Sequence, residues 1–94
     1  MAEREVTIGS RVGLHARPAA LFVKAATEQS MPVMIAKPGG QPVNARSMLA
    51  VLALGAKGGE TVVLFAEGDG AEAALDTLVE LLLQDLDAPE SADA

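Results

Sequence analysis

The only histidine of this 94-residue chain, His15, lies in the segment GLHARP, which spans residues 13 to 18. Arg17 and Pro18 follow it closely. A neutral imidazole can attack as a nucleophile, and a guanidinium group matches the geometry of phosphate oxygens. The segment therefore combines a nucleophilic nitrogen with a cation, a pair that suits phosphoryl chemistry.

A helix that begins at Ala16 would make His15 its N-cap and would place Pro18 in the first turn, where the missing N–H is tolerated. Imidazole is not among the usual capping groups, so the backbone N–H groups of Ala16 and Arg17 are expected to point out of the helix end. Such an end binds anions. We predict that His15 accepts a phosphoryl group, that Arg17 stabilises it, and that the backbone of Ala16 and Arg17 binds it.

Two other interpretations of His15 stay open on the residues alone. A lone histidine at a helix entry is often only a polar loop residue, and a metal site would need further histidine or cysteine ligands, which this chain lacks. We expect no metal site and no cofactor. A small phosphate-handling enzyme would need a general base or a group that positions water. The segment supplies neither, so we do not expect the chain to be an enzyme on its own.

Local sequence patterns predict the elements that must position this segment. Alternating or short apolar runs between turn residues indicate strands, and apolar residues spaced three and four apart indicate helices. The expected elements are a strand over 3–8, a helix over 16–28, a hairpin of strands over 33–37 and 42–45, a short helix over 48–54, a strand over 61–66 and a last helix after Asp69.

The order of these elements, βαββαβα, argues for an α+β two-layer sandwich with helices on one face of an antiparallel or mixed sheet. The strand TVVLFA, residues 61–66, is apolar on both faces, so we expect it to be central in the sheet. Asp69, with Glu72 three residues later, is the predicted cap of the last helix. The buried stripe of that helix is expected to contain Leu75, Leu78, Leu82 and Leu86.

Charge is distributed unevenly along the chain, whose formal net charge is −6. Residues 1–59 hold all seven bases and three acids, whereas residues 60–94 hold ten acids and no base. This acidity, together with only two aromatic residues, argues against a nucleic-acid partner. The absence of cysteine, of an export signal and of a long apolar run favours a soluble cytoplasmic protein that does not insert into membranes.

The length of the chain favours one domain with one core. We expect this domain to span residues 1–88 and a short acidic, frayed tail to span residues 89–94. Nothing in the sequence demands more than a monomer.

Two segments resemble the HPr family, the histidine-containing phosphocarrier proteins of the bacterial phosphoenolpyruvate:sugar phosphotransferase system. GLHARPAALFVKAA, residues 13–26, resembles the active-site segment of that family, and ARSMLAVLALGAKGGE, residues 45–60, resembles its second signature. The resemblance covers roughly residues 3–86. It implies the HPr-like open-faced β-sandwich, in which a four-stranded antiparallel sheet carries three helices on one face.

The resemblance also implies a function. His15 would accept a phosphoryl group on Nδ1 from phosphorylated enzyme I, which takes it from phosphoenolpyruvate, and would pass it to enzyme IIA domains for sugar uptake. The chain would then be a covalent carrier between enzymes. The alternative is a regulatory paralogue, either a nitrogen-branch phosphocarrier or a corepressor module phosphorylated on Ser47. An intact GLHARP segment favours the carrier.

Ser47 precedes the apolar run MLAVLALG and is expected to cap the short helix. The resemblance adds a regulatory role, because the matching serine of low-GC Gram-positive members is modified by a serine kinase/phosphorylase. The Ala-, Gly- and Val-rich composition suggests a high-GC genome, where that regulation is less expected.

An apolar surface is predicted on the short helix and the first helix. A two-turn helix needs one buried stripe, which Val51 and Leu54 supply. The remaining apolar residues could be scattered or could form a patch that suits a partner with an apolar, acidic face. The resemblance favours a patch, because family members dock partners through these two helices. Its expected residues are Ala20, Lys24, Met48, Leu49 and Leu52, beside Arg17.

Overall fold

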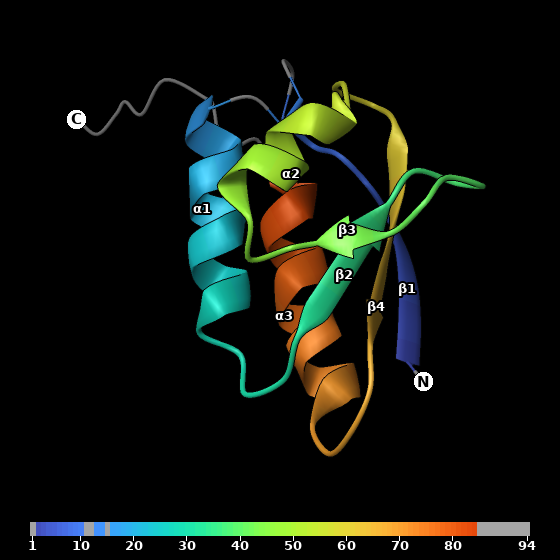
Figure 1. The fold of residues 1–94 in the computed structure, drawn as a ribbon. Coiled ribbons are helices and arrows are strands. Elements are labelled where there is room, and N and C mark those ends of the chain that lie inside the picture. The colour runs from blue at the N-terminus through green and yellow to red at the C-terminus, as the bar shows by residue number, and fades with distance from the viewer. Residues whose placement is uncertain (1, 11–12, 15, 85–94) are drawn as a thin grey trace.

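A computed structural model describes residues 2–10, 13–14 and 16–84 of the chain (Figure 1). His15 and the predicted tail, residues 89–94, lie outside the described residues. The elements are β1 (Ala2–Thr7), α1 (Ala16–Thr27), β2 (Val33–Ala36), β3 (Val43–Asn44), α2 (Met48–Leu54), β4 (Thr61–Ala66) and α3 (Ala71–Leu83). This is the predicted order βαββαβα.

The four strands form one sheet in the order β1-β4-β2-β3, and every neighbouring pair is antiparallel. The three helices lie on one face of this sheet, which confirms the predicted open-faced sandwich (Figure 1). β4 is central, as its two apolar faces predicted, because it pairs with both β1 and β2. None of the helices in the described ranges is both long enough and apolar enough to span a bilayer.

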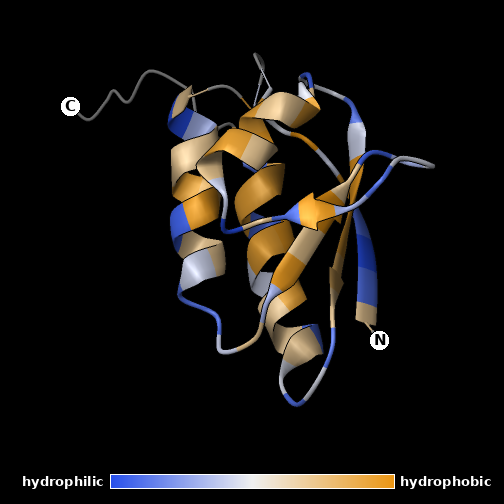
Figure 2. Cartoon of the chain, viewed as in Figure 1, coloured by the Kyte–Doolittle hydropathy of each residue, from blue (hydrophilic) through white to orange (hydrophobic). Residues whose placement is uncertain are grey.

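The core lies between the helices and the sheet. Figure 2 shows that many residues of the helices and strands that enclose it are hydrophobic. Phe22 of α1 and Leu64 of β4 are fully buried there, and α3 contributes Leu75, Leu78 and Leu82. Full burial of such a side chain stabilises the fold by about 1.5–3 kcal/mol. These leucines therefore outweigh the mild repulsion among the exposed acids of α3. The fourth predicted member of that stripe, Leu86, lies outside the described residues.

The start of α3 differs from the sequence prediction. Asp69 is not its cap; the N-cap is Gly70, which makes no side-chain hydrogen bond. Gly68 and Gly70 have φ values of 105° and 82°, a left-handed conformation that glycine adopts without steric penalty. This backbone path aligns the carbonyls of Gly68 and Gly70 with the N–H groups of Ala71 and Ala74, at 3.1 and 2.9 Å. Backbone geometry therefore sets the helix start.

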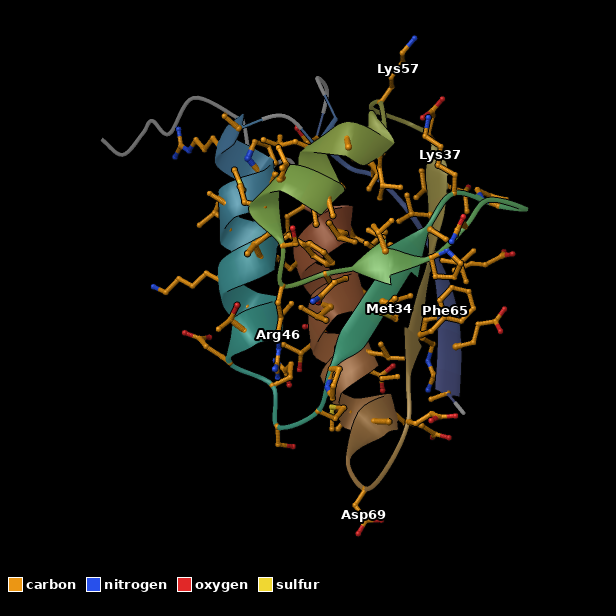
Figure 3. All side chains as sticks on the ribbon, viewed as in Figure 1. Met34, Lys37, Arg46, Lys57, Phe65 and Asp69 are labelled. Atoms are coloured by element: carbon orange, nitrogen blue, oxygen red, sulfur yellow. The ribbon has the colours of Figure 1, made fainter. Side chains whose placement is uncertain are left out.

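Arg46 joins the end of α1 to the start of α2 (Figure 3). Its Nη2 donates to the carbonyl oxygens of Gln29 at 2.7 Å and Met31 at 3.3 Å, and its Nε donates to that of Ala26 at 3.4 Å. Carbonyls at a helix C-terminus lack partners within the helix and carry partial negative charge. Of the three acceptors only Ala26 belongs to α1, and its carbonyl also accepts the Gln29 N–H at 3.2 Å. By binding all three, the guanidinium group fixes Arg46 against the end of α1 and the segment that follows it.

Candidate functional site

The loop that leads from β1 into α1 is tied to two distant parts of the chain. The Gly9 N–H donates to the Leu82 carbonyl near the end of α3, at 2.8 Å. The Leu14 N–H donates to the Ala56 carbonyl after α2, at 2.9 Å, and the Leu14 side chain is buried. The two described ends of the loop are therefore held by α3 and by the α2–β4 connection, and they fix where α1 begins.

Gly13 allows the chain just before α1 to approach the α2–β4 connection closely. Its φ is +81°, and a Cβ atom at this position would lie 2.3 Å from the Ala56 carbonyl oxygen and 2.7 Å from the Lys57 Cα. Both distances are shorter than any real Cβ contact, and both neighbours are backbone atoms. Only glycine therefore lets the chain before His15 pack on the α2–β4 connection in this conformation.

The connection itself is stabilised by Glu60. The Lys57 N–H donates to Glu60 Oε1 at 2.9 Å, and Lys37 Nζ lies 3.6 Å from the same oxygen. The backbone hydrogen bond from Lys57 and the positive charge of Lys37 lower the pKa of the Glu60 carboxyl group. The folded state therefore favours the carboxylate, and this contribution to stability is lost as the pH falls through that lowered pKa.

α1 begins at Ala16, as the sequence predicts. Ala16 and Arg17 are exposed, whereas Pro18 is fully buried in the first turn. The first turn of α1 has no acidic residue to neutralise the positive end of its dipole. Within the described part of the chain, no backbone carbonyl accepts the N–H of Ala16 or Arg17. His15 itself lies outside the described residues, so its predicted role as N-cap stays a prediction.

Ser47 caps α2 as expected. Its Oγ accepts a hydrogen bond from the Ala50 N–H at 3.1 Å, and its backbone is extended, with φ −100° and ψ 111°. Gly55 ends the helix in the left-handed conformation, and its N–H donates to the Leu52 carbonyl at 3.1 Å. The resulting helix has seven residues and buries Val51.

Most of the predicted partner surface is exposed. Leu49 is 80% exposed and Leu52 is 37% exposed. Ala20 and Lys24 of α1 are also exposed, and α1 packs beside α2 (Figure 1). Met48 differs, because it is half-buried and packs against the core. The structure therefore brings the predicted residues onto two neighbouring helices but directs part of Met48 inward.

Leu21 is a further exposed apolar residue that the sequence prediction did not include in this surface. It is 40% exposed. It lies one turn after Arg17 and immediately after Ala20, on the side of α1 that avoids the core. Its signal was present in the sequence, because the apolar stripe of Ala19, Phe22 and Ala26 leaves Leu21 on the outer face.

Ser10, in the loop between β1 and α1, is a buried polar residue that the sequence analysis did not identify. It is 1% exposed, and its Oγ has no hydrogen-bond partner among the residues that the structure describes. A buried hydroxyl without a partner destabilises the folded state, because it has lost its hydrogen bonds to water.

We expect Ser10→Ala to leave the free energy of unfolding unchanged or to raise it by up to about 1 kcal/mol, because the substitution removes that unpartnered hydroxyl. Urea denaturation of both proteins measures the difference. Ser47→Ala is the matched control, since it removes a hydroxyl that accepts a hydrogen bond, and it should lower stability by about 1 kcal/mol. A comparable loss for Ser10→Ala would show that the hydroxyl is hydrogen-bonded in solution.

Comparisons with known proteins agree with the geometry. The family model described as "PTS HPr component phosphorylation site" matches residues 2–84. The phosphocarrier protein HPr of Streptomyces coelicolor is 59% identical over 87 residues, which cover 93% of this chain and 94% of the relative.

Solved structures show the same fold. A crystal structure of HPr from Thermoanaerobacter tengcongensis superposes with a TM-score of 0.84 at 40% identity, covering 93% of this chain and 97% of that one. A structure of the Bacillus subtilis catabolite repression protein Crh, described as a dimer with a swapped domain, gives a TM-score of 0.68 at 35% identity. It covers 87% of this chain and 93% of the Crh chain.

Proposed function

This chain belongs to the HPr family, and we propose on that premise that it accepts a phosphoryl group on His15 from phosphorylated enzyme I and passes it to enzyme IIA components for sugar uptake. Proteins of this family are phosphocarriers, not catalysts. The observation that carries the proposal is the start of α1, where exposed Ala16 and Arg17 directly follow His15 and no acid lies in the first turn.

Phosphoryl transfer places charge on the transferred oxygens and needs positioning more than covalent help from the protein. The bond between phosphorus and His15 Nδ1 forms as the bond between phosphorus and the donor breaks, and the reverse exchange delivers the group to the acceptor. The new negative charge on His15 would face the N–H groups of Ala16 and Arg17 and the Arg17 guanidinium. Helix ends and charge-assisted hydrogen bonds both favour such an anion.

The test is direct detection of the phosphorylated chain. After incubation with enzyme I and phosphoenolpyruvate, mass spectrometry and phosphorus NMR should show one phosphoryl group in an acid-labile, base-stable linkage, as expected for phosphohistidine. The Streptomyces coelicolor HPr provides a positive control for the donor. Failure of this chain to accept the group while the control accepts it would reject the carrier function.

We further propose that the α1–α2 surface binds enzyme I and the enzyme IIA domains. Ala20, Leu49 and Leu52 would supply its exposed apolar area, and Met48 would support it from its half-buried position. Lys24 and Arg17 would add positive charge at its rim. An apolar patch with a basic rim complements a partner face that is apolar and acidic. This surface adjoins the start of α1, so a docked partner would be close to His15.

Leu52→Glu is expected to slow phosphoryl transfer from enzyme I by about tenfold or more, because it places a carboxylate inside an apolar interface with an acidic partner. The free energy of unfolding should fall by no more than about 1 kcal/mol, because Leu52 is 37% exposed and is not part of the buried core. Rapid-quench transfer assays and urea denaturation measure the two effects.

Gln41→Glu is the matched control for Leu52→Glu, since it adds the same charge to an exposed position in the β2–β3 hairpin. Its transfer rate should remain close to that of the unmodified chain. Equal rates for both variants would place the docking surface elsewhere.

The second candidate function is regulatory, and the similarity to Crh favours it. Phosphorylation of Ser47 by a serine kinase/phosphorylase would place a dianion at the N-terminus of α2, beside the exposed Leu49. Negative charge is favourable at a helix N-terminus. Incubation with such a kinase and ATP should then add a phosphoryl group that is lost in Ser47→Ala.

We propose that the carrier is a monomeric cytoplasmic domain spanning residues 1–88, and sedimentation should distinguish this monomer from a swapped dimer.

A further inference from the structure

The face of the sheet opposite the helices carries an apolar row of its own. Met34 of β2 lies beside Phe65 of β4, and Phe65 lies beside Glu3 of β1, so these side chains share one face. Leu64 and Ala66, the chain neighbours of Phe65, are buried toward the helices. Met34 and Phe65 are only half-buried. Their row is therefore accessible on the face that no helix covers.

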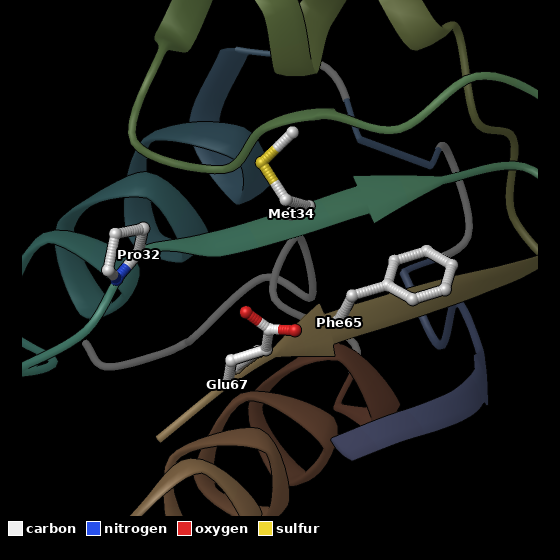
Figure 4. Close-up of a pocket in the computed structure, with 5 residues that line it drawn as sticks. Pro32, Met34, Phe65 and Glu67 are labelled. Atoms are coloured by element: carbon white, nitrogen blue, oxygen red, sulfur yellow. The ribbon is translucent and has the colours of Figure 1, made fainter. Parts of the chain in front are cut away.

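An open depression of about 300 Å³ lies in this row (Figure 4). It is lined by Pro32, Met34, Phe65, Ala66 and Glu67. The lining is apolar except for the carboxylate of Glu67. The chain contains only two aromatic residues, of which Phe22 is fully buried. The other, Phe65, presents part of its ring to this depression.

The surroundings of the depression are acidic. Glu67 is exposed at its edge, and Glu3 and Glu5 are exposed on the same face of the neighbouring strand. Among the described residues, none of these three carboxylates forms an ion pair. The nearest base on β1, Arg4, faces the helices, where its Nε bonds Asp76 Oδ1 at 3.1 Å. Lys37 is paired with Glu60 at 3.6 Å.

We propose that this depression is a docking site for a basic, extended segment of a partner protein. A lysine or arginine side chain would lay its aliphatic stem on Pro32 and Met34. Its cation would contact the Phe65 ring, which attracts cations through its quadrupole, and the carboxylates of Glu67 and Glu3. Charge complementarity favours this occupant over a second copy of the chain, whose net charge is −6.

The location of this depression separates it from the α1–α2 surface. The depression is on the open face of the sheet, whereas α1 and α2 lie on the other face (Figure 1). A partner held by a basic segment would therefore leave the α1–α2 surface and the start of α1 accessible. This proposal does not depend on the carrier function, because none of its residues belongs to that surface.

The test is an NMR titration of the full chain, uniformly labelled with ¹⁵N, by the peptide acetyl-Lys-Val-Arg-Val-Lys-amide at low ionic strength. The amides of residues 32–34 and 65–67 are expected to shift together and to saturate. Glu67→Lys should weaken binding by about tenfold or more, because it places like charges opposite each other. Phe65→Leu should weaken it by about threefold, because it keeps an apolar floor but loses the ring.

Glu80→Lys is the matched control, because Glu80 is an exposed acid on α3, away from the depression. It changes the net charge equally and should retain the binding of the unmodified chain. A peptide with glutamate at each basic position should produce no saturating shifts. If Phe65→Leu does not fold, Glu67→Gln tests the carboxylate contact of the same site without a change in the apolar row, and it should weaken binding.

Three outcomes would overturn the proposal. Shifts distributed over the acids of α3 without saturation at residues 65–67 would indicate non-specific attraction. Equal weakening by Glu67→Lys and Glu80→Lys would indicate that only net charge matters. Shifts of Met34 and Phe65 that depend on protein concentration without peptide would assign the depression to a second copy of the chain.

Discussion

His15→Ala is expected to abolish the acid-labile phosphoryl adduct that enzyme I and phosphoenolpyruvate form on the unmodified chain. The chain has no other histidine, so no second imidazole can accept the group in this variant. The loss should be complete within the detection limit of intact-mass spectrometry, and the phosphorus resonance of the phosphorylated protein should disappear. This variant tests the assignment of the acceptor residue.

The variant Arg17→Ala tests whether Arg17 stabilises the phosphoryl group that His15 accepts. Arg17 is exposed, so the variant should fold normally. It should still form the adduct, but about tenfold more slowly, because it loses one charge-assisted contact. Amide spectra of both variants establish that they are folded. A full adduct in His15→Ala, or an unchanged rate in Arg17→Ala, would show that the start of α1 does not act as proposed.

Gly13→Ala is expected to destabilise the fold strongly, because a methyl group there meets the backbone at Ala56 and Lys57. The left-handed φ of 81° and the 2.3 Å approach to the Ala56 oxygen each oppose a Cβ atom. Together, a conformational term of about 1 kcal/mol and overpacking of about 1–3 kcal/mol predict a loss of about 2–4 kcal/mol. This is a large part of the stability of a small domain.

The same substitution should slow phosphoryl acceptance, since the displaced backbone adjoins Leu14 and the start of α1. Urea denaturation and transfer assays with enzyme I measure the two losses. Gly39→Ala is the matched control, because Gly39 also has a positive φ, 75°, but a Cβ atom there would have no neighbouring atom within 4 Å. It should lose only about 1 kcal/mol and keep the transfer rate. Equal losses in the two variants would show that the contact with Ala56 contributes nothing.

Several features of the fold could be predicted because they depend on residues close in sequence. The apolar spacing of α1, the Ser47 cap and the two-sided apolarity of β4 gave the starts of α1 and α2, the element order and the central strand. Asp69 shows the limit of such reasoning. It satisfies a capping pattern, yet the left-handed glycines on each side of it start α3 one residue later.

The residue types of the candidate site could be predicted from the sequence, but the long-range contacts that hold the site in place could not. GLHARP identified the start of α1, and the apolar residues left over from the core stripe identified Leu49 and Leu52. No local pattern indicated that Arg46 would cap α1, because the guanidinium group and the Ala26 carbonyl are 20 residues apart. Leu14 and Ala56 are likewise distant in sequence.

The sequence by itself determined which residues form helices and strands and which side chains could carry phosphoryl chemistry, because periodicity, capping and side-chain type are local properties. Only the tertiary structure decided that Gly13 packs on Ala56, that Gly9 bonds the end of α3, and that Phe65 faces the open side of the sheet. These contacts join residues far apart along the chain. Their free energies depend on strand register and on the close approach of backbones, which arise only when the whole core is packed.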